Sequence, residues 1–160
     1  MKILVFSDSH NNTRKMREAI SLHKGDCEAV IFLGDGINDI QSLKAYYPQI
    51  AFFVVRGNCD FYCTNEDKEK LVCLGGISIL ITHGDLYGVK GGYGVIAQAC
   101  EKQGADAVFF GHTHVAFDSV MEVNGKNIHL FNPGSIGRNG EYGIVYTSGK
   151  ILVTSHGKIS

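Results

Sequence analysis

The fold is decided by the stretch KILVFSDSH, residues 2–10, and by a second stretch of the same kind, AVIFLGD, at residues 29–35. Each is a short, almost continuous apolar run that leads into an aspartate. Such runs are typical of strands buried on both faces of a parallel sheet. A third run, IAFFVV at residues 50–55, leads into Arg56-Gly57-Asn58. The sequence therefore predicts strands over 2–7, 29–33 and 50–55, with polar residues at their carboxyl ends.

Helical patterns separate these runs. One helix is predicted from Thr13, with Asn12 or Thr13 as its N-cap, because apolar residues recur at helical spacing after it. A second opens near Asn38 or Asp39 and must end before Pro48. The order strand, helix, strand, helix, strand predicts a right-handed α/β arrangement.

The second half of the chain changes to hairpins. Gly75-Gly76, Asn124-Gly125 and Ser148-Gly149 are expected tight turns between apolar segments. With no linker or repeat in view, we expect two packed sheets with outer helices in a single domain, residues 1–160. The expected elements are strands over 70–74, 77–82, 107–110, 115–123, 126–131, 143–147 and 151–155, and a helix from Gly92 or Tyr93 to about Gln103.

Composition excludes several classes of protein. The 160 residues carry 15 Lys and Arg against 16 Asp and Glu, a net charge of -1, so the basic surface needed to bind long nucleic acid is not expected. The first apolar run is too short for a signal peptide or a membrane span. Five cysteines form an odd set that fits a reducing compartment, and we expect a cytoplasmic protein without a membrane partner.

Five short polar cassettes carry the chemistry of the chain, and most directly follow an apolar run. Any one aspartate after a strand is more often a turn or helix cap, and histidines such as His23, His129 and His156 are expected to be surface or satisfied core residues. A role as turn or helix caps would not account for four histidines in five cassettes. Together the cassettes therefore predict a metal site at the carboxyl edge of a sheet. They are Asp8-Ser9-His10, Gly34-Asp35, Gly57-Asn58-Cys59-Asp60, Thr82-His83-Gly84-Asp85 and Gly111-His112-Thr113-His114.

The residue types in these cassettes narrow the choice of metal. A carboxylate can bridge two cations, which makes Asp35 the natural centre of a binuclear site, with Asn58 supplying an amide oxygen. His83, His112 and His114 would supply nitrogens. Mixed nitrogen and oxygen ligands without thiolate favour Mn, Fe, Zn, Co or Ni over Mg or Ca. By contrast, Asp26, Asp39 and Asp106 are expected to be caps or solvated loop residues.

In order over residues 8–114, the pattern Asp-x-His, Gly-Asp, Gly-Asn-x-Asp, His-Gly and Gly-His-x-His resembles that of the calcineurin-like metallophosphoesterase superfamily. The segments at 7–11, 56–60 and 132–135 look like its small single-domain phosphodiesterase branch, which also includes the scaffold subunit of the eukaryotic retromer complex. The resemblance implies a four-layer α/β/β/α sandwich of two mixed β-sheets flanked by helices.

The resemblance also implies a ligand set and a reaction. Two divalent ions are implied, Mn first, with Ni, Fe, Zn or Co as alternatives, and a hydroxide that bridges them would attack the phosphorus. The implied catalytic residues are Asp35, Asn58, Cys59 and Asp60. Asp8, His10, Asp35 and His114 would surround one ion, and Asp35, Asn58, His83 and His112 the other.

One position departs from the larger family, where a histidine follows the asparagine; here Cys59 takes its place. A thiol is a weaker proton donor, which puts general-acid catalysis in doubt. Asn11 and Arg138 are candidate substrate contacts, the latter from a loop expected to be flexible. We expect a metal-dependent phosphodiesterase acting on a small phosphodiester; a phosphomonoesterase and a non-catalytic scaffold are the alternatives, and homo-oligomerisation is left open.

Overall fold

The structure is a computed structural model that describes residues 1–160, and it contains ten strands and three α-helices. No helix is both long enough and apolar enough to cross a membrane. The helices are α1 (Thr13–His23), α2 (Ile37–Tyr46) and α3 (Gly94–Lys102), with 3-10 turns η1 (Asp85–Tyr87) and η2 (Val89–Gly91). The strands are β1 (Lys2–Phe6), β2 (Ala29–Phe32), β3 (Ala51–Val54), β4 (Glu69–Leu74), β5 (Ile77–Thr82), β6 (Ala107–Phe109), β7 (Phe117–Val123), β8 (Lys126–Asn132), β9 (Glu141–Ser148) and β10 (Ile151–Lys158).

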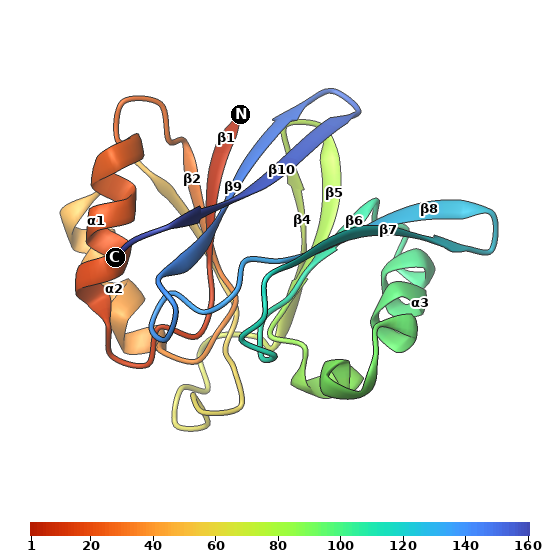
Figure 1. Ribbon diagram of the computed structural model, residues 1–160, viewed down its shortest axis with the longest axis horizontal. Helices are drawn as coiled ribbons and strands as arrows, with labels where there is room; N and C mark the ends of the chain where they lie inside the picture. Colours follow the sequence, from red (N-terminus) through yellow and green to blue (C-terminus); the bar gives the residue numbers. More distant parts are fainter.

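The strands form two mixed sheets of five strands each (Figure 1). The first has the order β10-β9-β1-β2-β3, in which β1, β2 and β3 are parallel and β9 and β10 are antiparallel. The second has the order β4-β5-β6-β8-β7, in which β5, β6 and β8 are parallel. The predicted strand-helix alternation and the late hairpins are therefore confirmed.

Four layers stack in the order helix, sheet, sheet, helix, which confirms the predicted sandwich (Figure 1). Alternate residues of β1 explain the stacking, because successive side chains of a strand point to opposite faces. Leu4 and Phe6 pack in the cluster beneath α1 and α2, whereas Ile3 and Val5 pack between the two sheets. A third cluster joins the second sheet to α3.

Two local predictions differ from the structure. Helix α2 begins at Ile37 instead of Asn38 or Asp39, because the carboxylate of Asp60, distant in sequence, accepts the backbone N–H groups of Gly36 and Ile37. The β9–β10 turn consists of Gly149 and Lys150 instead of Ser148-Gly149, since Ser148 pairs with Ile151 across the hairpin. Strand β10 continues to Lys158 because it pairs with β9 along its whole length.

Candidate metal centre

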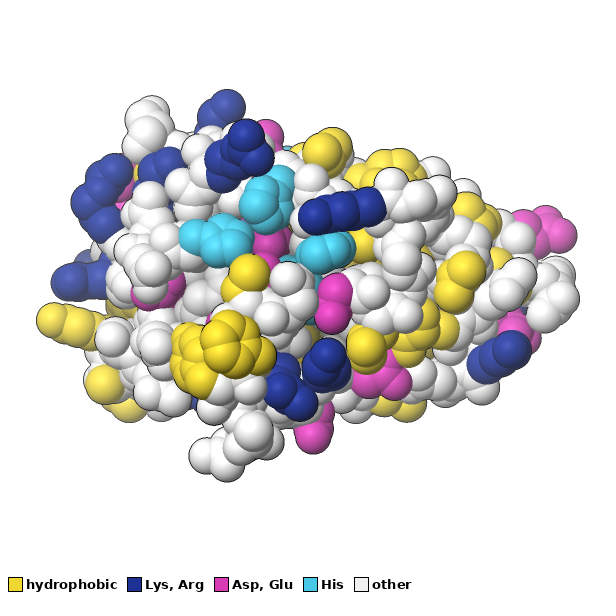
Figure 2. Space-filling view, turned by 90° about the horizontal axis from the view of Figure 1, so that it is seen from below, with side chains coloured by type: hydrophobic (Ala, Val, Ile, Leu, Met, Phe, Trp, Pro, Cys, Tyr) yellow, Lys and Arg dark blue, Asp and Glu magenta, His cyan; other side chains and the backbone are white.

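The polar cassettes meet at one edge of the molecule, where the ends of the two stacked sheets lie next to each other. Strands β1, β2 and β3 of the first sheet lead into three of them, and β5 and β6 of the second sheet lead into the other two. Figure 2 views this edge from below Figure 1 and shows histidines gathered around acidic side chains, with Lys and Arg at the flanks. The predicted convergence of the cassettes is what the fold produces.

The backbone of these turns is strained in a selective way. Seven residues other than glycine have a positive φ, a conformation that costs L-residues about 1–2 kcal/mol. Six of the seven lie in the site turns, and the seventh is Asn124 in a hairpin turn. Strain of this kind concentrates at functional sites, where the surrounding structure enforces it. The six are Asp8 (55°), His10 (43°), Asn11 (69°), Asp35 (61°), His112 (68°) and His114 (60°).

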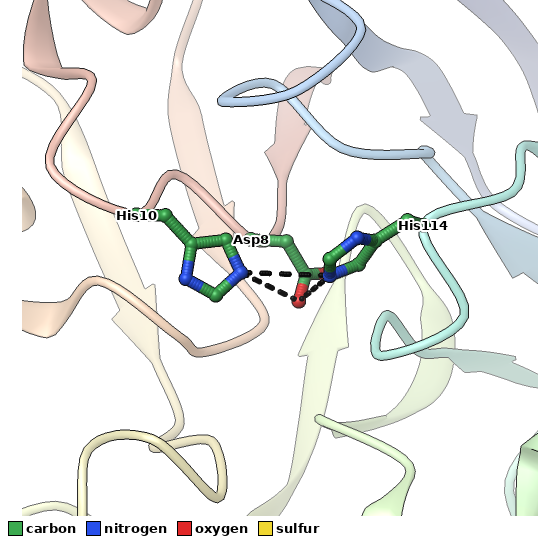
Figure 3. A group of neighbouring side chains, drawn as sticks. All are labelled: Asp8, His10 and His114. Carbon is green, nitrogen blue, oxygen red and sulfur yellow. Dashed lines mark hydrogen bonds and ion pairs between the residues drawn. The ribbon is translucent and has the colours of Figure 1, made fainter.

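The first group of ligands consists of Asp8, His10 and His114 (Figure 3). The Nε2 atom of His114 lies 3.1 Å from Asp8 Oδ1, and the Nε2 atoms of His10 and His114 are 3.5 Å apart. Asp8 is fully buried, and its Oδ2 atom accepts hydrogen bonds from the Ser7 hydroxyl at 2.5 Å and the His112 N–H at 3.1 Å. Its Oδ1 atom is thereby turned toward the histidines.

The second group is built around the buried His83. Its Nδ1–H donates to the carbonyl of Leu33 at 2.7 Å, so Nε2 is the nitrogen that faces the site. That Nε2 lies 3.2 Å from His112 Nδ1 and 3.4 Å from Asp35 Oδ2. Asp8 Oδ1 is 3.9 Å away, so Asp8 as well as Asp35 lies between the two groups. The bridging role assigned to Asp35 stays a prediction.

The spacing of these atoms fits a shared cation. Two nitrogens bound to one ion at about 2.0–2.1 Å, with an angle between 90° and 109°, are separated by about 2.9–3.4 Å. The separations of 3.2 Å for His83 and His112 and 3.5 Å for His10 and His114 are close to this range. The backbone carbonyl that takes the Nδ1 proton of His83 orients the ring as in metal-bound imidazoles.

The ionisable groups of the site shift one another's pKa values in the metal-free protein. Burial alone would raise the pKa of Asp35, but the hydrogen bond to His83 and the charge of that ring hold it well below its usual range. Burial alone would lower the pKa of His83, but Asp35 and Asp8 raise it. Burial, the charge of His83 and that of Lys90 lower the pKa of His112. Asp35 therefore favours its charged form and stabilises the protonated form of His83, whereas His112 favours its neutral form.

Asn58 and Cys59 lie on the exposed side of the site. The side chain of Asn58 contacts Cys59 Sγ at 3.7 Å, and the backbone N–H of Cys59 donates to Asp35 Oδ1 at 2.8 Å. The Cys59 sulfur also lies within 4.8 Å of possible ligand atoms of His10 and Asp35. Burial and the neighbouring Asp35 carboxylate raise the pKa of Cys59 to about 11, so the free thiol stays protonated at neutral pH.

Two buried carboxylates hold the turns in place. Asp60 is 1% exposed and accepts the backbone N–H groups of Asp35, Gly36, Ile37 and Gly57 at 2.7–3.1 Å. Both of its oxygens are occupied by these contacts, which position the Asp35 turn, so a direct catalytic role for Asp60 stays only a prediction.

Asp39 acts on the first turn and corrects the expectation of a cap or solvated residue. Its carboxylate is buried and accepts the hydroxyls of Ser9 and Thr13 and the N–H of Asn11. Because Ser9 stands between two ligands, Asp8 and His10, this contact fixes the path of the ligand-bearing turn.

The segment at 132–137 is largely buried and hydrogen-bonded, which corrects the expectation of a flexible loop. Ser135 donates its hydroxyl to the carbonyl of Asp8, and Ile136 and Gly137 donate their N–H groups to Ser7 and Asp8. This segment therefore braces the first turn, and Arg138 follows it with an exposed side chain. Asn11 is likewise exposed at the site edge, so the substrate contacts predicted for Asn11 and Arg138 stay predictions.

The remaining histidines lie outside the site and have partners of their own. His23 contacts the hydroxyl of Tyr142, His129 contacts Asp118, and His156 donates to the carbonyl of Asn132. Sequence reasoning missed the carbonyl of Leu33, the buried Asp39 and the nearby Lys90. A backbone carbonyl has no sequence signature, and only the tertiary fold brings Asp39 and Lys90 to the site.

With this geometry in place, comparison with known proteins settles the family. The family model described as the calcineurin-like phosphoesterase superfamily domain matches residues 1–150. The chain belongs to this superfamily. A relative from Bacillus subtilis, the probable metallophosphoesterase YsnB, is 35% identical over 137 residues, which are 85% of this chain and 75% of that protein.

Several solved structures share the fold over nearly the whole chain. A predicted phosphoesterase from Streptococcus pneumoniae is 24% identical with a TM-score of 0.77, covering 98% of this chain and 88% of that one. Vps29 from Entamoeba histolytica, crystallised with Zn²⁺, is 19% identical with a TM-score of 0.73, covering 99% and 98%. An archaeal phosphodiesterase is 24% identical with a TM-score of 0.68, covering 98% and 99%. These structures confirm the fold, and by family the protein is a metallophosphoesterase.

Proposed function

We propose that this protein is a phosphodiesterase that uses two divalent ions to hydrolyse a small phosphodiester. The observation that carries the proposal is the pair of adjoining ligand groups, Asp8-His10-His114 and Asp35-His83-His112, with nitrogen and oxygen atoms facing one another at 3.1–3.5 Å. When bound there, divalent ions supply an activated water and positive charge for the phosphoryl oxygens. The archaeal phosphodiesterase of the same fold supports the choice of a diester.

The chain's own residues fix the metal ligands in position but provide only a weak proton donor for the leaving group. Ser7 and the His112 N–H fix Asp8, while Asp60 fixes the turn of Asp35. Cys59 stands where the larger family has a histidine, and a thiol is a weaker hydrogen-bond donor than an imidazolium, so general-acid help to the leaving group is weak. We therefore expect the rate to rise steeply as the pKa of the leaving alcohol falls, which a series of substituted phenyl methyl phosphates would measure.

Activity with added metal tests the proposal directly. Purified protein should hydrolyse bis(4-nitrophenyl) phosphate when Mn²⁺ is added and lose this activity in a chelator; Ni²⁺, Fe²⁺, Zn²⁺ and Co²⁺ are assayed in parallel. Mn²⁺ is the first choice because the ligands combine imidazole and carboxylate. Folded protein with no activity in any of these metals would rule out the proposal.

A phosphomonoesterase is the nearest competing enzyme, because the same ions can attack either kind of ester. The two are separated by the ratio of kcat/KM for bis(4-nitrophenyl) phosphate to that for 4-nitrophenyl phosphate. A ratio above one supports the diesterase, and a ratio below one supports the monoesterase.

A scaffold is the alternative from a different class, and the likeness to Vps29 is the observation that favours it. The complete set of His10, His83, His112 and His114 argues for metal chemistry instead. Asp35→Ala and His112→Ala should lose bound metal and activity together while the circular dichroism spectrum is unchanged. Retention of wild-type metal content in both variants would contradict the ligand assignment.

A further inference from the structure

Two neighbouring aromatic side chains project into solvent directly after the Asn58-Cys59-Asp60 turn. Phe61 is 77% exposed and Tyr62 is 53% exposed, with their rings in an edge-to-face contact at 5.8 Å. Five other phenylalanines, Phe6, Phe32, Phe109, Phe110 and Phe131, are fully buried, whereas Tyr46 and Tyr146 are exposed at 61% and 45% but are not adjacent to a second exposed ring. Exposing two adjacent rings forgoes the stabilisation that burial gives large apolar side chains.

This exposure is built into an anchored segment. Immediately before Phe61, the carboxylate of Asp60 is held by four backbone N–H groups of the site turns. Immediately after Tyr62, the N–H of Cys63 donates to the carbonyl of Asp60 at 2.9 Å, and Cys63 packs against the core beneath the helices. The two rings are thus carried by backbone that is fixed at both ends.

The same anchor ties the rings to the metal centre. Asp60 accepts the N–H of Asp35 itself at 2.7 Å, and Phe61 is the next residue along the chain. Exposed apolar residues also follow the ligands of the second sheet: Leu86 after His83, at 52%, and Val115 after His114, at 60%. Figure 2 shows hydrophobic side chains bordering the histidines on this face. The polar ligand cluster therefore has an apolar border that includes two rings.

The combination selects a kind of ligand. Divalent ions held by the facing ligands would attract an anion such as a phosphoryl group, and aromatic faces favour a flat ring stacked on them. Building on the proposed phosphodiesterase, we propose that Phe61 and Tyr62 form a stacking subsite for a nucleobase or similar aromatic group of the substrate. The net charge of -1 fits a mononucleotide or short ester better than a long polynucleotide.

The test compares two ligands that differ only in the base. Adenosine 5′-phosphate and ribose 5-phosphate are titrated by calorimetry into Mn²⁺-loaded protein, with released phosphate measured in parallel. A base stacked on an aromatic side chain should tighten binding about 5- to 140-fold. We expect wild-type protein to prefer adenosine 5′-phosphate by at least fivefold, and Phe61→Ala/Tyr62→Ala to bind the two ligands equally, with its affinity for ribose 5-phosphate within twofold of wild type.

A matched control removes the same number of exposed apolar residues elsewhere. Ile151 and Val153 on β10 are 64% and 52% exposed, and Ile151→Ala/Val153→Ala should keep the wild-type preference. Equal binding of both ligands by wild-type protein, or a preference that survives in Phe61→Ala/Tyr62→Ala, overturns the stacking subsite. Hydrolysis of bis(4-nitrophenyl) phosphate by the same wild-type sample reports separately on the proposed function, so either idea can fail while the other stands.

Discussion

At the scale of single residues, the site depends on side chains that do not face its centre. Asp60 binds four backbone N–H groups and so joins the turn after β3 to the turn after β2 and to the start of α2. Asp39 holds the turn that carries Asp8 and His10 by accepting two hydroxyls and one backbone N–H. The positions of the ligands are therefore set by buried hydrogen bonds as much as by the strands.

Replacing Asp60 should be among the most damaging single changes. Asp60→Ala leaves four donors of the turns without their acceptor, and unsatisfied buried groups cost about 1–3 kcal/mol each, offset where water can enter. We expect the free energy of unfolding in urea to fall by about 3 kcal/mol or more. Asp67→Ala is the control, because Asp67 is an exposed carboxylate of the same loop; equal losses in both variants would contradict this role.

Metal affinity should depend on pH through His83. Its pKa is raised in the metal-free protein by Asp35 and Asp8, so below that pKa the ring binds a proton that an ion must displace. The affinity for Mn²⁺ should therefore be full above the raised pKa and fall up to about tenfold per pH unit below it, for one displaced proton. Calorimetry in buffers of different ionisation enthalpy counts the protons released; no release at pH 6 would contradict the prediction.

At the scale of elements, the turns after β2 and β3 are pressed together backbone to backbone. A Cβ atom on Gly34 would lie 2.4 Å from the backbone nitrogen of Gly57, and Gly34 also has a φ of 97°. Side chains are excluded at this contact, which brings Asp35 beside the Asn58 cassette. Gly34 and Gly57 thus let the two turns pack closely, while Asp35 and Asn58 of the same cassettes are the candidate metal ligands.

The contact predicts different costs at two glycines with similar backbone strain. Gly104, which follows α3, has a φ of 74° and nothing within 4 Å of an added Cβ. Gly104→Ala should cost only the conformational strain, about 1–2 kcal/mol. Gly34→Ala adds the clash with Gly57, so its urea midpoint should fall clearly further and its Mn²⁺ binding should weaken. Similar midpoints for the two variants would show that the turns can separate freely.

Much of the fold could be predicted because the local sequence patterns favour the same helices and strands as the tertiary packing does. The apolar runs before Asp8 and Asp35 appear as β1 and β2, and the Asn12 side chain caps α1 as one of two predicted choices. Strand β9 inserts between β1 and β10, an arrangement that pairing sets and local pattern does not. The candidate ligands were recognisable by type and order, whereas Asp39 and the carbonyl of Leu33 act across long sequence separations.

At the scale of the whole molecule, the metal centre joins the two sheets. His10 and Asp35 come from the first sheet, and His83, His112 and His114 from the second. An ion held by ligands from both sheets would stabilise their packing, since any ligand that binds only the folded state shifts unfolding.

Bound metal should therefore raise the unfolding temperature. At a Mn²⁺ concentration 100 times the dissociation constant, one ion adds about 2.7 kcal/mol. For a chain of this size that is roughly 5–11 °C. Differential scanning calorimetry with Mn²⁺ and with chelator measures the shift. His112→Ala should lose most of it, while His129→Ala, outside the site, should keep it; a full shift in His112→Ala would contradict the assignment.

The apolar layer between the two sheets has a longer-term consequence. Its buried cluster contains 14 residues, including Ile3, Ile31, Ile79 and Phe109, and none of the candidate ligands. The two sheets are thus held together by apolar packing that does not involve the candidate metal ligands. A related chain could therefore lose its histidine ligands one at a time and still fold. The surface at the former metal centre could then evolve a different function.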